Sequence, residues 1–236
     1  MLRLLVACAC LCIATPAFAQ NTTGVFGPTV DADDHNLVYR AAIVFDDGDD
    51  SWGQRIHYER AVNDRFRPRI VVATRERGGN QVDLDFVRLE AVLQLTPDER
   101  KWQRGLRFEA RMRDEGAEEI RVNFANQWSL GDGWRARAIL LNTLQVADRT
   151  NDELQFSTRL GVSRKLDGGA RVGVHGFFGL GDTSGLNVLN DRVDSEAGPF
   201  VAFDISDNVD MYIGTLHALT DGSPDTQLRI FVGRSF

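Results

Sequence analysis

The sequence predicts an all-β fold, a closed antiparallel transmembrane β-barrel of about 12 strands. Three observations lead to this prediction. Apolar and polar residues alternate over long segments between residues 37 and 236, turn residues separate these segments, and the chain ends inside an alternating segment on Phe236. A strand places successive side chains on opposite faces, whereas a helix repeats about every 3.6 residues, so the alternation indicates strands.

Residues 1–19 have the composition of a secretory signal peptide. A short positive start is followed by an apolar stretch and by small residues, which predicts cleavage between Ala19 and Gln20. The alternative is a lipoprotein signal ending at Cys8, although almost no apolar region precedes that residue. We expect no disulfide and no cysteine ligand in the mature protein, because every cysteine lies in the removed segment. These cysteines are Cys8, Cys10 and Cys12.

Residues 20–36 are rich in glycine, threonine and aspartate, and we predict that they form a periplasmic N-terminal lead-in to a β-barrel domain at 37–236. The net charge of −7 and the lack of a basic tail in the sequence argue against nucleic-acid binding. Lys101 and Lys165 are the only lysines, so arginine supplies nearly all of the positive charge.

The expected strands follow one another along the whole domain. The clearest covers residues 101–113, where Phe108 and Met112 share an apolar face while Glu109 and Arg111 lie on the opposite face. Three polar residues interrupt the apolar faces elsewhere: Asn126, Asn142 and Arg164. In chain order the expected strands are 37–46, 54–62, 65–75, 86–95, 101–113, 119–130, 134–146, 154–166, 170–180, 198–206, 209–219 and 228–236.

The connections between these segments are of two kinds. Short turns with Gly, Asn, Asp or Pro suit tight hairpins, and they lie at 63–64, 96–100, 131–133, 167–169 and 207–208. Longer acidic connections lie at 46–50, 75–81, 114–118, 148–153, 181–197 and 221–226. Short periplasmic turns and longer external loops are typical of bacterial transmembrane barrels.

Alternation alone does not separate a membrane barrel from a secreted soluble β-protein. Two further features favour the membrane. The expected strands run to about 10–13 residues, whereas globular strands average about 5–6 and spanning strands need about 9–11. Tryptophans lie close to the short turns, where an aromatic girdle at the membrane interface is expected, although they could also cap a soluble sandwich core. These residues are Trp102, Trp128 and Trp134.

The C-terminal segment carries the most specific signal. Leu228, Ile230, Val232 and the terminal Phe236 resemble the C-terminal insertion signal of bacterial outer-membrane β-barrel proteins, although Arg234 stands where that signal has an apolar or aromatic residue. The resemblance implies that the protein resides in the outer membrane of a Gram-negative bacterium. It also implies contact with outer-membrane lipid and lipopolysaccharide, and assembly by the barrel-assembly machinery.

Charged residues alternate with the apolar ones and are expected to line the lumen. A ring of fixed cations would make an anion-preferring pore for a small anionic solute, as in the twelve-stranded acidic-sugar channels, whose arginine-lined lumens this pattern resembles. In the alternative, arginines and glutamates pair and fill the lumen as a network. The candidates are Arg67, Arg69, Arg88, Glu90, Arg107, Glu109, Arg111, Glu119, Arg121, Arg135, Arg137, Arg159, Arg171 and Arg229.

The sequence points to no catalytic, cofactor or metal site. The four histidines, His35, His57, His175 and His217, show no zinc-binding spacing, and the His-x-Ser-Asn-Gly motif of outer-membrane phospholipases is lacking. We therefore expect a passive, narrow, porin-like channel without a cofactor. The alternatives are a non-conducting surface barrel, an outer-membrane lipid hydrolase and a secreted soluble β-protein.

Overall fold

The fold is taken from a computed structural model. It describes residues 22–46, 50–77, 81–97, 100–114, 118–146, 154–183, 185–186 and 194–236. The expected signal peptide and its cleavage site lie outside these residues. Among the described residues, no helix is long and apolar enough to cross a membrane.

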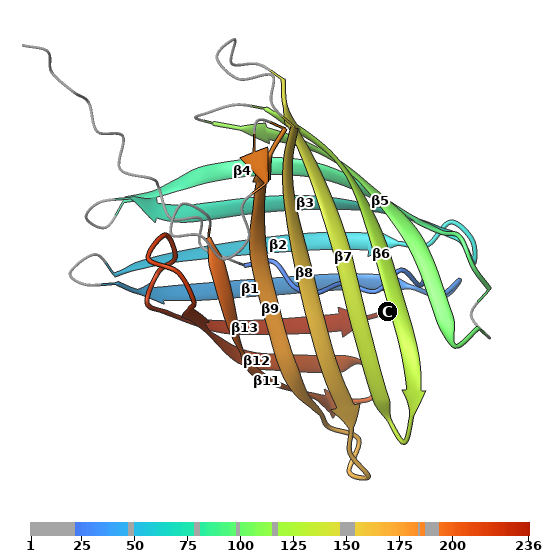
Figure 1. The fold of residues 1–236 in the computed structure, drawn as a ribbon. Coiled ribbons are helices and arrows are strands. Elements are labelled where there is room, and N and C mark those ends of the chain that lie inside the picture. Colours follow the sequence, from blue (N-terminus) through green and yellow to red (C-terminus); the bar gives the residue numbers. More distant parts are fainter. Residues whose placement is uncertain are drawn as a thin grey trace, which may run out of the picture.

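The chain forms one antiparallel sheet of twelve long strands that closes on itself (Figure 1). Consecutive long strands are hydrogen-bonded, and β13 pairs with β1 to complete the ring. The short strand β10 (Gly185–Leu186) pairs with the end of β9 and is not one of the strands that close the barrel. The long strands are β1 (His35–Phe45), β2 (Ser51–Arg60), β3 (Phe66–Arg77), β4 (Gln81–Gln94), β5 (Trp102–Arg113), β6 (Glu119–Gly131), β7 (Trp134–Gln145), β8 (Leu154–Lys165), β9 (Arg171–Asp182), β11 (Ser195–Ser206), β12 (Val209–Ala218) and β13 (Thr226–Ser235).

Each predicted strand coincides with one long strand of the barrel, and the fold class is confirmed. The connections divide into two ends as expected, but their lengths overlap. The connection at 78–80 is shorter than that at 95–101, which lies at the end of the short turns. The reason is that β3 continues to Arg77 and β4 begins at Gln81, so both strands extend into the expected connection.

The apolar side chains face outward and the charged ones face inward. Ile56, Leu89 and Val174 expose 45%, 53% and 53% of their surface, whereas the neighbouring Arg55 and Arg88 expose 4% and 1%. A soluble barrel has the opposite arrangement, because its apolar faces form the core. This orientation is therefore the one that a hydrocarbon environment requires. Because the sheet is closed, no unpaired strand edge faces the hydrocarbon.

The polar residues that interrupt the outer apolar faces form hydrogen bonds with neighbouring groups. Trp102 Nε1 donates to Asn126 Oδ1 at 3.1 Å, and Asn142 Nδ2 donates to the Val122 carbonyl at 2.8 Å. Arg164 Nε donates to a main-chain carbonyl of the adjacent turn at 3.4 Å. Hydrogen bonding lowers the free-energy penalty of a polar group on an apolar surface, so these residues fit the outward face.

The predicted aromatic residues gather at the end of the short turns. Trp102 and Trp128 lie opposite each other on β5 and β6 with their rings stacked 6.4 Å apart. Trp134 lies just after the β6–β7 turn and exposes 44% of its surface. These half-exposed indoles lie at one end of the barrel, where an aromatic girdle is expected. Their contact with the membrane interface stays a prediction.

The terminal strand presents its alternating apolar residues outward. Leu228, Ile230 and Val232 are partly exposed on β13 between buried neighbours. Phe236 N donates to the His35 carbonyl at 3.0 Å, which continues the pairing of the last strand with the first. Arg234 lies with its guanidinium 5.0 Å from the Phe236 ring, so its aliphatic part follows the apolar row while its charge meets a π-face.

The expected periplasmic lead-in at 20–36 requires a correction. From Thr22 to Val30 the chain lies inside the barrel without regular secondary structure, and an exposed turn at residues 31–34 leads from there into β1 at His35 (Figure 1). Val25 and Val30 expose only 5% and 1% of their surface. The composition of 20–36 resembles a linker, and it gives no sign that a closed barrel would enclose the segment.

Candidate functional site: the lumen of the barrel

One wall of the lumen carries a network of alternating charges. Glu90 Oε2 accepts from Arg69 Nη1 at 3.0 Å, and Glu90 Oε1 lies 2.6 Å from Arg88 Nη2. Glu109 lies 3.2 Å from Arg88 and 2.5 Å from Arg107. Both carboxylates have no exposed side-chain surface, so every charge in this wall depends on its neighbours for stabilisation.

Toward the acidic loops lies a third shared carboxylate. Glu119 accepts from Arg121 at 2.5 Å, from Arg113 at 2.9 Å and from Arg111 at 3.3 Å. Toward the short turns, Arg69 and Arg67 pair with Glu59, and Arg67 also pairs with Asp34. The predicted residues of β3 to β6 are thus brought together as ion pairs.

The opposite wall differs, because its arginines lack such partners. Within the described part of the chain, no carboxylate forms an ion pair with Arg135, Arg137, Arg159, Arg171 or Arg229. Their hydrogen bonds go to neutral groups: Arg137 Nε donates to Gln127 Oε1 at 2.6 Å, and Arg229 Nη2 donates to Tyr212 Oη at 2.5 Å. The positive charge of β7, β8, β9 and β13 is therefore not neutralised within the wall.

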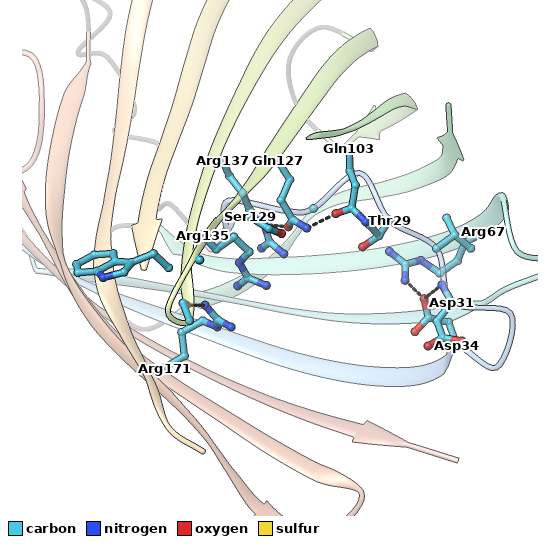
Figure 2. A pocket seen from close by; sticks show the side chains of 15 residues that line it. Thr29, Asp31, Asp34, Arg67, Gln103, Gln127, Ser129, Arg135, Arg137 and Arg171 are labelled. Carbon is cyan, nitrogen blue, oxygen red and sulfur yellow. Dashed lines mark hydrogen bonds and ion pairs between the residues drawn. The ribbon is translucent and has the colours of Figure 1, made fainter. Parts of the chain in front are cut away.

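A cavity of about 730 Å³ opens at the end of the short turns (Figure 2). Arg135, Arg137 and Arg171 line one side of it, and Arg67 lies across from them with Asp34. Arg67 pairs with that carboxylate, whereas the three arginines have no described carboxylate partner. The cavity is thus an electropositive pocket on the side of β7 and β9.

A second cavity of about 620 Å³ lies toward the acidic loops. Its lining includes Arg111, Arg121 and Arg159, together with Glu196. Asp194 borders it just before β11, and partial burial there raises the pKa of the Asp194 carboxyl above its usual value.

The N-terminal segment separates the two cavities. Gly27 and Thr29 border the cavity at the short turns, whereas Thr22 and Thr23 border the one at the loops. Gly105 on β5 permits its close passage, because a Cβ at that position would lie 2.8 Å from the Pro28 carbonyl oxygen. The segment therefore occupies the lumen between the two openings.

Unpaired arginines hold this segment. Three guanidinium groups, from β7, β8 and β13, donate to three successive carbonyls of the coil. The bonds are Arg229 Nη1 to Thr23 O at 2.9 Å, Arg159 Nη1 to Gly24 O at 3.3 Å, and Arg137 Nη1 to Val25 O at 3.1 Å. Further along, the Arg107 guanidinium lies 3.5 Å from the Phe26 ring centroid, and Val30 N donates to Gln94 Oε1 at 2.5 Å.

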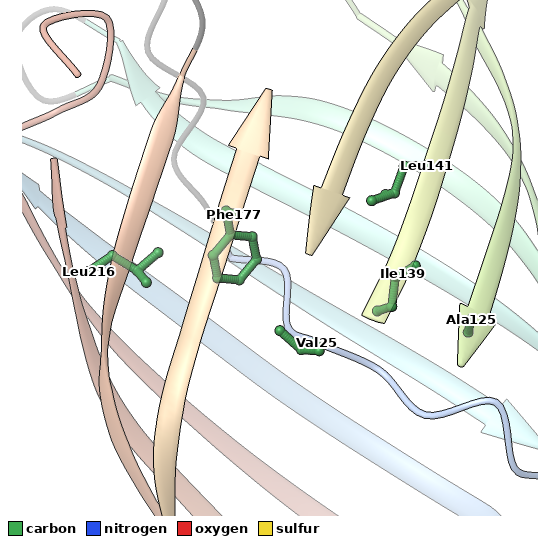
Figure 3. Close-up of a cluster of buried hydrophobic side chains, with 6 residues drawn as sticks. All are labelled: Val25, Ala125, Ile139, Leu141, Phe177 and Leu216. Atoms are coloured by element: carbon green, nitrogen blue, oxygen red, sulfur yellow. The ribbon is translucent and has the colours of Figure 1, made fainter. Parts of the chain in front are cut away.

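A small apolar cluster supports the segment from the wall. Val25 packs among inward-facing apolar side chains (Figure 3). These are Ala125, Ile139, Leu141, Phe177 and Leu216. Ile139 and Leu141 interrupt the charged face of β7, and this interruption is the signal in the sequence that could have revealed an apolar contact inside the lumen.

Sequence reasoning missed further charged residues of the lumen, among them Glu59, Arg113, Arg40 and Arg55. Arg40 and Arg55 are directly opposite each other in the register of β1 and β2, and Arg55 exposes only 4% of its surface. They lie in segments of weak alternation. His57 and His175 are also buried inside. Among the described residues, no group of His, Cys, Asp and Glu side chains has an arrangement that could hold a metal ion.

The outward apolar rows and the charged interior together define a twelve-stranded transmembrane β-barrel. No protein-family model matches the chain, and no curated protein matches it. Solved structures do. The COG4313 outer membrane channel from Pseudomonas putida F1 has a TM-score of 0.72 at 11% identity, over 88% of this chain and 97% of the other.

Two porins have similar folds. The KdgM porin has a TM-score of 0.63 at 11% identity, and the NanC porin one of 0.64 at 9% identity; each covers 85% of this chain, and the matches cover 99% and 100% of the porins. The structural neighbours are thus bacterial outer-membrane β-barrel porins and channels. At these identities the likeness concerns the fold.

Proposed function

We propose that this protein is a narrow, anion-preferring channel of the outer membrane. The observation that carries the proposal is the wall of arginines without carboxylate partners, on β7, β8, β9 and β13. Fixed cations in an enclosed lumen raise the local concentration of anions and lower the barrier to their passage. In the network on β2 to β6, shared carboxylates offset part of the arginine charge, so the unpaired arginines of the other wall are the ones most available to a solute.

The proposed location and partners follow from the outer surface. Outward apolar rows contact outer-membrane lipid, and the external loops face lipopolysaccharide. The C-terminal residues are the signal for the barrel-assembly machinery. A small anionic solute is the proposed cargo. One solved structure is described as the KdgM porin in complex with disordered oligogalacturonate, and an acidic sugar chain of this kind fits the chemistry of the lumen.

The anion preference makes a direct prediction. The double variant Arg135→Glu and Arg171→Glu will shift the reversal potential in a salt gradient toward cations, because it replaces two unpaired cations of one cavity with anions. Arg100→Glu, at an exposed turn, is the matched control and will leave the reversal potential close to that of the wild type. Equal shifts in both variants would refute the role of the arginine wall. Arg107 is a poorer choice, since it pairs with Glu109.

Deletion of Phe236 will reduce the amount of folded barrel in outer-membrane fractions several-fold. The residue ends the alternating signal of β13, and its main chain closes the last hydrogen bond to His35. Heat-modifiable gel migration measures the folded fraction, and Phe236→Trp, which keeps a terminal aromatic ring, is the control. If the deletion leaves the folded fraction unchanged, Phe236 is not part of an insertion signal.

A non-conducting structural barrel is the second candidate. The observation that favours it is the N-terminal segment, which lies across the lumen between the two cavities. Planar-bilayer recordings separate the two candidates, because a channel shows discrete openings and a closed structural barrel shows none.

The lipid-hydrolase alternative has little support among the described residues. His57 is buried in the lumen and cannot reach lipid on the outer face. The half-buried His35 contacts the Tyr58 hydroxyl at 2.9 Å, and His217 contacts threonine hydroxyls. The outer membrane phospholipase A from Escherichia coli also has a similar fold, with a TM-score of 0.52 at 10% identity, so we propose from the placement of the histidines, and not from the fold, that this protein is not an enzyme.

A further inference from the structure

We infer that the N-terminal segment Thr22–Val30 is a displaceable plug that occupies a polyanion-binding site formed by Arg137, Arg159 and Arg229. The inference deepens the proposed channel function and rests on it. An anionic chain that reaches these arginines competes with the plug, and its binding opens the path between the two cavities.

The first argument is the chemistry of the contact. Each of the three guanidinium groups donates to a neutral main-chain carbonyl of the plug. Both a carbonyl and a carboxylate accept a charge-assisted hydrogen bond from a guanidinium, but only the carboxylate adds an opposite charge and can accept two parallel bonds from the same group. The plug therefore satisfies the arginines without neutralising their charge, and a ligand with several carboxylates would do both.

The second argument is how loosely the plug is attached. Among the described residues, no main-chain to main-chain hydrogen bond joins residues 24–30 to the barrel wall. The plug is held by side chains, chiefly those of the three arginines, Arg107 and Gln94. The strands, in contrast, are held by continuous ladders. A segment outside these ladders can leave the lumen while the hydrogen bonds that close the barrel stay intact, so its release is a local opening rather than unfolding.

The third argument is position. The plug touches both cavities, so its departure joins an opening of about 730 Å³ to one of about 620 Å³. The vacated path is lined by Arg137 and Arg159, which border these cavities. The same residues thus hold the closed state and attract the solute.

A disulfide that fixes the plug tests the inference. Val25→Cys with Gly161→Cys suits this purpose, because a Cβ at Gly161 would lie 3.3 Å from Val25 Cγ1, the position that a cysteine sulfur takes. The mature protein has no other cysteine if the signal is cleaved as expected. The oxidised variant will be closed in planar bilayers, and dithiothreitol will restore openings. Each single-cysteine variant carries the same packing change at its site and will not respond to dithiothreitol.

Deletion of residues 22–30 provides the complementary variant and leaves the expected cleavage site in place. It will conduct several-fold more often than the wild type. Citrate, a tricarboxylate, will raise the open fraction of the wild type several-fold relative to chloride of equal ionic strength. It will have no such effect on the deletion variant or on the oxidised disulfide variant. Arg159→Gln with Arg229→Gln will weaken the citrate response while keeping hydrogen-bond donors.

The outcomes distinguish the two proposals. A deletion variant that folds but never conducts would overturn the channel function and the plug with it. Conduction by the oxidised disulfide variant at the level of the wild type would overturn the plug and leave the channel standing. A citrate response that survives in the deletion variant would show that the anion acts elsewhere, and would overturn the competition for the three arginines.

Discussion

Replacement of Glu90 by glutamine will destabilise the folded barrel by about 3–5 kcal/mol, the usual effect of removing one partner from a buried charge cluster. Glu90 lies between Arg69, Arg88 and Arg107, and its side chain has no exposed surface. Glutamine keeps the shape and one acceptor but removes the negative charge. The guanidinium groups around it then repel one another in an enclosed lumen.

The measurement is the free energy of unfolding in urea, followed by tryptophan fluorescence in lipid bilayers. Glu118→Gln is the matched control, because that carboxylate is exposed beside the start of β6. A surface change of this kind stays within about 0.5 kcal/mol of the wild type. If the two variants unfold at the same urea concentration, the carboxylates of the network are not what holds that wall together.

Leu89→Arg will destabilise the barrel in bilayers by about 2–4 kcal/mol, the range found for arginine on the lipid face near the midplane. Leu89 lies in the middle of β4 and is 53% exposed on the outer surface. In water, an exposed leucine is replaced by arginine with little effect. A large loss of stability at so exposed a position therefore identifies hydrocarbon as the surrounding medium.

Leu130→Arg is the control for this prediction. It is 61% exposed on the same outer surface, but it lies at the end of β6 beside the turn, where the penalty falls to about 0–1 kcal/mol. The difference between the two variants reports depth in the membrane. Equal stabilities, or a barrel that stays folded in water without detergent, would contradict the membrane assignment.

The strands and the separation of their two faces could be predicted from the sequence because both depend on local alternation, whereas strand length, the tryptophans and the C-terminal segment indicated which face meets lipid. The segment 101–113 illustrates this, since its apolar and charged residues separate into two faces, with Arg104 as the one exception on the apolar face. The inward direction of Arg88 or Arg135 follows from the same periodicity. Arg40 and Arg55 were missed because alternation is weak around them, and the directly opposed pair becomes visible only through the register of β1 and β2.

The plug could not be predicted for a different reason. Residues 22–30 have no periodicity, and their glycine and threonine content resembles that of an ordinary linker. Val25 finds its apolar neighbours on β6, β7, β9 and β12, which are far away in the sequence. Only Ile139 and Leu141, as apolar residues on a charged face, hinted at something to be covered inside the lumen.

The sequence by itself determined that this chain forms long strands with one apolar and one charged face, because the alternation of side chains along a strand is a local property of the backbone. Only the tertiary structure decided which arginines are neutralised, since pairing depends on how neighbouring strands are aligned. It also decided that the N-terminal coil fills the lumen, because its binding site is assembled from strands that closure alone brings together.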